Sequence, residues 1–187
     1  RGEMITQKQL GREAIRIEQD VIQESVGSQD QVWAAHGGLS RIDFGRDGEI
    51  DVNPLIVSQE RRVELENNII LFFSGISRTA DSIAKDQIAN FDKKESNLHR
   101  MHEMVDEAAA ILQNDRSDLR ELGALMNDSW RLKRDISDLV SNKNIDEIFD
   151  AAIDAGAIGG KLLGAGGGGF FLFVVPPERR ENLKEKL

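Results

Sequence analysis

The sequence contains no cysteine and only three prolines among its 187 residues. The absence of cysteine excludes disulfides, thiolate catalysis and cysteine-based zinc sites, and it fits the cytoplasm, where we expect the protein to reside. No apolar run approaches the roughly 18 residues that a membrane-spanning helix needs, and no low-complexity tract of the disordered type is present. The sequence therefore predicts a folded domain without a membrane span.

Positive charge is also scarce. The chain has 24 lysines and arginines against 33 aspartates and glutamates, a formal net charge of −9 and a pI of about 4.9. A chain with this charge repels nucleic-acid phosphates and anionic membranes, so we expect neither as a partner. An anionic small molecule would need a local cluster of arginine and lysine that opposes the overall field.

The length and the 40% content of hydrophobic residues suit one domain, or one domain with an extension. The chain starts at Arg1 rather than at a methionine, and a helical pattern follows almost at once. Leu187 lies inside another helical pattern. We therefore expect both termini to be cuts within a longer protein, which leaves the fold incomplete at both ends.

The first part of the chain predicts one helix and three strands. Apolar residues at helical spacing predict a helix over residues 5–25, which Gly27 ends. Residues 38–57 are typical of two short strands joined by a glycine-containing turn at residues 45–48. The compact apolar run Ile69–Phe73 predicts a buried strand.

The second part predicts a block of four helices and then another strand. The apolar run Phe170–Val175 is typical of a buried strand, and the two prolines that follow it end it before a last helix begins. Strands on either side of a block of helices indicate an α+β fold with a mixed or antiparallel sheet. The four helices are predicted at Thr79–Phe91, Leu98–Leu112, Ser117–Val140 and Ile145–Ala155.

A glycine-rich run, Gly159–Gly169, separates the last of these helices from the strand. It is not a Walker loop, because Ala155 stands where that loop needs glycine and Leu162 stands where it needs serine or threonine. Its G-x-G-x-x-G spacing precedes a strand instead of opening a helix, which excludes a dinucleotide fingerprint. A structural tight turn and an anion-binding loop both remain open. Four consecutive glycines cost about 1 kcal/mol each in regular structure, which favours a use beyond turning.

The segment Gly156–Phe170 resembles the third motif of the GHMP kinases, a family of small-molecule kinases. Its Lys-Leu-Leu-Gly form is most similar to the branch that phosphorylates heptose 7-phosphate. The resemblance implies a GHMP-kinase-like fold, ATP and Mg²⁺ as cofactors, and a loop that lies by the active site and supports the nucleotide-phosphate loop. The loop residues that it implies are Lys161, Gly164, Ala165, Gly166, Gly167 and Gly168.

Two carboxylates near the start, Glu18 and Asp30, are candidates for catalysis and metal binding. Their spacing alone does not distinguish them from the solvated surface charge that most acidic residues provide. The segment with Glu18 and the loop that carries Asp30-Gln31 resembles the corresponding segments of galactokinases and heptose kinases. The resemblance implies that Asp30 is catalytic, as a base or as an orienting group, and that Glu18 is associated with the metal.

Three basic residues are candidates for binding an anionic sugar. Arg78 follows the strand at Ile69–Phe73, and Lys133 and Arg134 lie near Trp130 in the third helix. An alternative interpretation makes Arg78 a surface residue, Lys133 and Arg134 a solvated face, and Trp130 a core residue. Both local patterns resemble heptose 7-phosphate kinases, which implies contacts with the phosphate of the substrate.

The resemblance thus implies an ATP-dependent sugar kinase that phosphorylates the anomeric hydroxyl of D-glycero-D-manno-heptose 7-phosphate. Alternatives are a galactose or fucose kinase, a non-catalytic sugar-binding homologue, and an interaction domain with a structural glycine loop. Residues 1–60 are expected to form the last part of the N-terminal kinase domain, and residues 61–187 are expected to form a C-terminal domain that is truncated at its end. The main phosphate loop is expected upstream of residue 1, so we expect the 187 residues alone to be inactive. The oligomeric state is not predicted.

Overall fold

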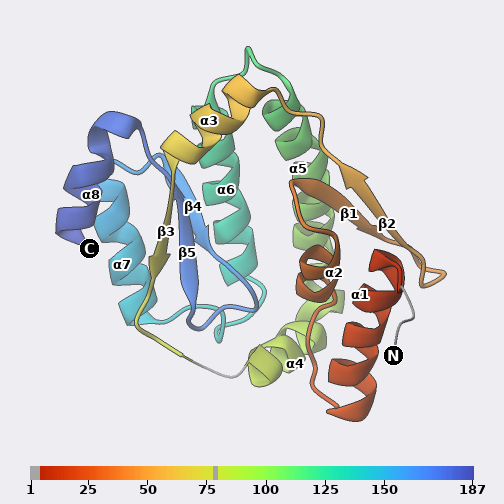
Figure 1. Ribbon diagram of the computed structural model, residues 1–187. Coiled ribbons are helices and arrows are strands. Elements are labelled where there is room, and N and C mark those ends of the chain that lie inside the picture. The colour runs from red at the N-terminus through yellow and green to blue at the C-terminus, as the bar shows by residue number, and fades with distance from the viewer. Residues whose placement is uncertain (1–4, 78–79) are drawn as a thin grey trace. The chain divides into compact units, whose positions relative to one another are not determined.

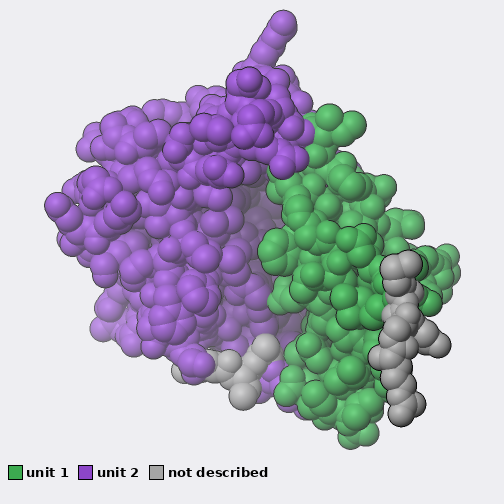
Figure 2. Space-filling model, viewed as in Figure 1, with its two compact units in different colours: residues 1–56 green, residues 57–187 purple. Residues whose placement is uncertain are grey.

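The computed structural model describes residues 5–77 and 80–187 and divides the chain into two compact units (Figure 2). Unit 1 contains residues 1–56 and unit 2 contains residues 57–187, and each is described by itself. The boundary expected after residue 60 falls inside a helix of unit 2, α3 (Gln59–Asn68).

Unit 1 consists of two helices and a hairpin. Helix α1 (Gln7–Arg16) starts at a capping box formed by Thr6 and Gln9, and it continues into the π-helical turn Ile17–Val21. Its Gly11 packs against α2 (Gln29–His36), where a Cβ would lie 3.5 Å from the Cα of Val32. The hairpin pairs β1 (Ser40–Phe44) with β2 (Ile50–Pro54), as predicted.

Helix α2 was not predicted, because its segment was interpreted as a loop. The helix has only eight residues and buries only Gln31 and Val32 on its short apolar face, so it has no repeating apolar stripe. Asp30 therefore lies in the first turn of a helix and not in a loop. The helix predicted over residues 5–25 ends earlier, and Gln23 adopts a positive φ of 63° after the π-helical turn.

Unit 2 is built on a three-stranded antiparallel sheet with the order β3-β5-β4 (Figure 1). Strand β5 (Phe170–Val174) lies in the centre, between β3 (Ile69–Phe73) and β4 (Gly159–Leu162). The predicted strands at β3 and β5 are confirmed. Strand β4 was not predicted, because its first half is glycine and it was assigned to the loop.

The four predicted helices are present, and the α+β prediction is correct. Helix α6 ends at Arg134 and not at Val140, and its cap is Asp118, whose side chain accepts from Arg120, and not Ser117. Helix α3 was not predicted, because it is charged on most of its surface. Within the described residues, no helix combines the length and the apolar character needed to cross a bilayer. The remaining helices are α4 (Ala80–Asn90), α5 (Glu95–Gln113), α6 (Leu119–Arg134), α7 (Lys143–Asp154) and α8 (Arg180–Lys186).

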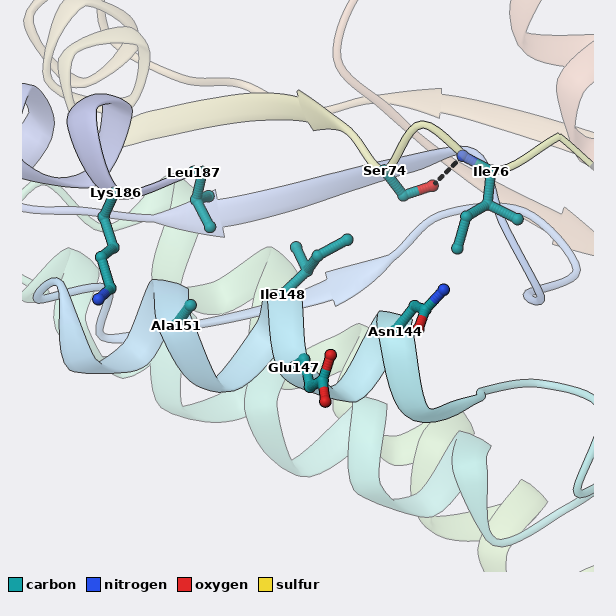
Figure 3. Close-up of a pocket in the computed structure, with 8 residues that line it drawn as sticks. All are labelled: Ser74, Ile76, Asn144, Glu147, Ile148, Ala151, Lys186 and Leu187. Carbon is teal, nitrogen blue, oxygen red and sulfur yellow. Dashed lines mark hydrogen bonds between the residues drawn. The ribbon is translucent and has the colours of Figure 1, made fainter.

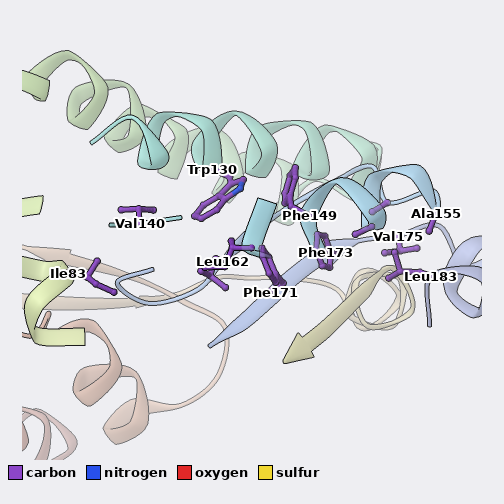
Figure 4. Close-up of a cluster of buried hydrophobic side chains, with 13 residues drawn as sticks. Ile83, Trp130, Val140, Phe149, Ala155, Leu162, Phe171, Phe173, Val175 and Leu183 are labelled. Carbon is purple, nitrogen blue, oxygen red and sulfur yellow. The ribbon is translucent and has the colours of Figure 1, made fainter. Parts of the chain in front are cut away.

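Aromatic side chains form the centre of the core of unit 2 (Figure 4). Phe171 and Phe173 of β5 stack with ring centroids 5.2 Å apart. Trp130 of α6 meets Phe171 edge-on at 6.4 Å, and Phe149 of α7 lies 6.0 Å from Phe173. Trp130 is fully buried, so its interpretation as a core residue is confirmed. The strand that follows the glycine run is thereby anchored to two helices.

Helix α6 approaches β4 very closely at two glycines. A Cβ on Gly159 would lie 2.0 Å from the carbonyl oxygen of Gly123, which is part of the α6 backbone. Real Cβ contacts are never this short, because the atoms would overlap. The close approach therefore depends on the absence of a side chain at residue 159, and it fixes β4 and the residues after it against α6.

Candidate functional site

The glycine run forms the hairpin connection between β4 and β5, and its glycines are needed for close packing. Gly166 has a φ of 112°, and a Cβ there would lie 2.8 Å from the carbonyl oxygen of Val140. A Cβ on Gly168 would lie 2.5 Å from the carbonyl oxygen of Ile76. The structural explanation for the glycines is therefore correct at these two positions. The G-x-G-x-x-G pattern follows a strand after all, but it leads into β5 and not into a helix, so the exclusion of a dinucleotide fold stands.

Two backbone amides of the loop are used inside the protein. The amide of Gly167 donates to the carbonyl oxygen of Val140 at 2.8 Å, and that of Gly169 donates to Ile76 at 2.9 Å. These hydrogen bonds tie the loop to the segment after α6 and to the segment after β3. The loop is thus held in one conformation from two sides.

Two side chains hold carbonyl groups of the same loop. Nζ of Lys133, from α6, donates to the carbonyl oxygen of Gly164. Nε2 of Gln87, from α4, donates to the carbonyl oxygen of Ala165 at 2.6 Å. By contrast, the amides of Gly164, Ala165 and Gly166 donate to no acceptor in the described part of the chain. Successive free amides of this kind are typical of anion-binding turns.

Lys133 is buried, with only 8% of its surface exposed, so its interpretation as part of a solvated face is wrong. A second lysine, Lys161 of β4, lies close by, with its Nζ 3.4 Å from Oγ of Ser129. Among the described residues, neither ammonium group forms an ion pair with a carboxylate. The structure therefore places two lysines near each other, of which Lys133 holds the loop, and neither has an ion-pair partner among the described residues.

Burial shifts the titration of both lysines. It lowers the pKa of Lys133 to about 7, and the positive charge of Lys161 adds to this shift. Burial also lowers the pKa of Lys161 below its ordinary value. Both effects have the same physical cause, since a charged ammonium group loses its hydration when it is removed from water.

We expect the stability of unit 2 to depend on Lys133 in a pH-dependent way. Because the pKa of Lys133 is depressed to about 7 in the native state, the native state loses this proton above pH 7 while the unfolded chain keeps it up to about pH 10. The free energy of unfolding of the wild type, relative to Lys133→Met, should therefore rise by a few kcal/mol between about pH 6.5 and 9.5.

Fluorescence of Trp130 during urea unfolding measures this effect. A Trp33→Phe background is needed, because Trp33 and Trp130 are the two tryptophans of the chain and Trp33 lies in unit 1. Lys161→Met should move the rise to higher pH, since it removes the repulsion that helps to lower the pKa of Lys133. A wild type and a Lys133→Met variant with the same pH dependence would contradict the assignment.

The other predicted anion-binding residues are arranged differently. Arg134 stacks on Trp130, with its guanidinium carbon 5.6 Å from the ring centroid, and pairs with Asp146 at 3.0 Å. Its neighbour Lys133 points to the glycine loop, so the two cations contact different groups. Arg78 lies outside the described residues, and its predicted role stays a prediction.

The predicted carboxylates lie in unit 1. Asp30 is exposed in the first turn of α2. Glu18 lies in the π-helical turn and accepts a hydrogen bond from Nε2 of Gln31. The amide orientation of Gln31 is fixed by chemistry, because its oxygen would be repelled by the carboxylate. This leaves Oε1 of Gln31 buried and without a donor among the described residues, on a side chain that is 9% exposed.

A surface pocket of about 360 Å³ opens in unit 2 beside the segment after β3 (Figure 3). Ser74, Ile76, Asn144 and Glu147 line it together with residues from α7 and the C-terminal end. Ser74 accepts a hydrogen bond from the amide of Ile76 at 3.3 Å, as the dashed line in Figure 3 shows. None of the predicted site residues lines this pocket, so it is not the candidate site.

Comparison with known proteins identifies a domain family, and relatives among both curated proteins and solved structures. The domain family described as GHMP kinases C terminal matches residues 104–187. Over 159 residues the chain is 34% identical to the D-glycero-alpha-D-manno-heptose 7-phosphate kinase of Campylobacter jejuni, which covers 84% of this chain and 47% of that protein. Over 146 residues it is 27% identical to the bifunctional fucokinase/GDP-fucose pyrophosphorylase of Arabidopsis thaliana, covering 75% of this chain and 14% of that protein.

Among solved structures, the fold is similar to that of a D-glycero-D-manno-heptose 1-phosphate kinase from Bacteroides thetaiotaomicron. The TM-score is 0.71 at 26% identity, over 97% of this chain and 48% of that one. The chain therefore spans about half the length of the heptose kinases that it matches.

Proposed function

The chain carries the C-terminal domain of the GHMP kinases, and on this premise we propose that it belongs to an ATP-dependent sugar kinase. The expected family and its fold class are confirmed by the domain match and the solved structures. We propose D-glycero-D-manno-heptose 7-phosphate as the substrate and its anomeric hydroxyl as the acceptor. The name of the relative from Campylobacter jejuni supports this choice. The cytoplasmic location stays a prediction from the sequence.

The observation that carries the proposed chemistry is the arrangement of carboxylates in unit 1. Gln31 holds Glu18 by a hydrogen bond, while the neighbouring Asp30 leaves its carboxylate exposed at the start of α2. An exposed, ionised carboxylate accepts a hydrogen bond from a sugar hydroxyl. It then either takes the proton or orients the oxygen for attack on the terminal phosphate of ATP.

The residues around Glu18 fit a magnesium ion. Mg²⁺ prefers oxygen ligands and is usually held by one or two carboxylates together with substrate phosphates and water. Oε1 of Gln31, which has no donor among the described residues, and the carboxylate of Glu18 would supply such ligands. When bound, Mg²⁺ neutralises phosphate charge.

A panel of acceptors with the full-length protein tests the proposal. The second-order rate constant kcat/KM should be at least about 100-fold higher for heptose 7-phosphate than for the unphosphorylated heptose, because charge-assisted hydrogen bonds to a phosphate contribute a few kcal/mol. Preference for fucose or galactose would favour the alternative that the fucokinase relative supports. Turnover of no sugar at all would favour a sugar-binding protein without catalysis.

A further inference from the structure

Two consecutive peptide groups of the glycine loop are held by side chains from different helices. Lys133 of α6 donates to the carbonyl of the peptide group that joins Gly164 to Ala165. Gln87 of α4 donates to the carbonyl of the next peptide group, which joins Ala165 to Gly166. A loop of this length needs neither bond for closure, since its ends are already fixed by the pairing of β4 with β5.

The geometry of the peptide group determines what these contacts do. In a trans peptide the N–H points opposite to the C=O, so a donor that fixes the carbonyl also fixes the direction of the N–H. The structure contains no cis peptide bond in its described residues. Lys133 therefore aims the amide of Ala165, and Gln87 aims the amide of Gly166. Neither amide has an acceptor within the described ranges.

We infer that Lys133 and Gln87 are positioning residues that aim the amides of Ala165 and Gly166 at one phosphoryl group. A carbonyl that accepts a hydrogen bond polarises its own peptide, which makes the N–H a stronger donor. Lys133, which is buried, and Lys161, which is half-buried, add positive charge when they are protonated, and no carboxylate among the described residues pairs with either of them. The charge of the lysines, the two N–H donors of Ala165 and Gly166 and the fixed directions of these donors thus favour an anion with tetrahedrally arranged oxygens.

The chemistry identifies a phosphoryl group but not the molecule that carries it. The phosphoryl group belongs either to ATP or to the sugar phosphate, and this choice rests on the proposed function. Gln87 was not identified as a site residue from the sequence, and only its hydrogen bond to Ala165 indicates a role. The sequence predicted that Lys133 contacts the phosphate of the sugar directly. The role inferred here differs, because Lys133 acts by orienting a peptide group of the glycine loop.

Binding measurements on the full-length protein test the inference with matched pairs of ligands. One arm compares ATP with adenosine, and the other compares heptose 7-phosphate with heptose. Gln87→Met should weaken the phosphorylated member of one pair about tenfold, and Lys133→Met should weaken it more, while the unphosphorylated member is unchanged. The exposed residues Lys85 on α4 and Arg131 on α6 provide the matched controls Lys85→Met and Arg131→Met, which should leave all dissociation constants unchanged.

The pair that responds identifies the source of the phosphoryl group. Equal losses for both members of a pair would mean that the side chains only support the fold, and no loss in either pair would also overturn the inference. If a variant does not fold, hydrogen exchange on the wild-type protein still tests the inference. Exchange at the amides of Ala165 and Gly166 should slow when ATP or heptose 7-phosphate is added, and unchanged exchange with both ligands would overturn the inference. The acceptor panel is independent of these results, because the kinase activity is measured there on the wild type.

Discussion

Replacing Asp30 with asparagine is expected to lower the proposed sugar-kinase turnover of the full-length protein at least about 100-fold, which is the usual contribution of a general base. Asparagine has nearly the same size and is tolerated in the first turn of a helix, where Asp30 lies. The side chain is exposed, so the substitution disturbs no packing. What it removes is the negative charge and the ability to accept a proton from the sugar hydroxyl.

Steady-state kinetics with heptose 7-phosphate and ATP measure this effect. Asp20→Asn is the matched control, because Asp20 is also an exposed aspartate of unit 1, in the π-helical turn that contains Glu18. The control should keep normal turnover. Near-normal turnover of Asp30→Asn would contradict the assignment of Asp30 and leave the membership of the family untouched.

Replacing Gly159 with alanine is expected to destabilise unit 2 by about 3 kcal/mol, the upper part of the range for overpacked sites. The new Cβ would lie 2.0 Å from the carbonyl oxygen of Gly123 and 3.0 Å from Cβ of Asn127. Both neighbours belong to α6, whose backbone cannot move away without disturbing the core around Trp130. The strand would have to shift, and Lys161 and the glycine loop would shift with it.

Urea unfolding in the Trp33→Phe background measures the loss through the fluorescence of Trp130. Gly27→Ala is the control, since a Cβ there meets no atom within 4 Å and the residue does not have a positive φ. It should change stability by less than about 0.5 kcal/mol, as is usual for surface substitutions. A Gly159→Ala variant as stable as the wild type would show that α6 and β4 do not approach as closely as described.

The elements that the sequence predicted share strong apolar patterns. Strands β3 and β5 are continuous apolar runs, and helices α4 to α7 carry enough apolar residues at helical spacing to be recognised. Helix α3 is different, because Arg61 is its one fully buried residue and most of its other side chains are polar. Its only local signal is Ser58, which caps the helix by accepting from the amide of Arg61. The helix is held instead by a long-range contact, since Arg61 donates to the carbonyl oxygen of Ile111 at 2.8 Å, and no local sequence pattern reveals this contact.

The sequence predicts which residues of the candidate site are basic, but not which groups these residues contact. Lys133 and Arg134 are adjacent in the sequence, yet Lys133 is buried and bonded to the glycine loop, whereas the half-buried Arg134 lies over the ring of the core residue Trp130. Only the position of the loop, set by β4 and β5, decides which of them becomes buried. Gln87 is 78 residues from the carbonyl that it holds, so no local pattern identifies it. The domain boundary and the roles of the site residues remain predictions.

The strand order of unit 2 has a consequence for synthesis on the ribosome. Strand β3 pairs with β5, whose residues lie about a hundred positions further along the chain, and β5 also pairs with β4. Helices α5 and α6 are neighbours in the sequence and can pair early, but β3 must wait for its partner until about a hundred further residues have been translated. During this interval its apolar residues are exposed to other nascent chains. We therefore expect the sheet to form last, and a pause in translation after β3 to increase aggregation.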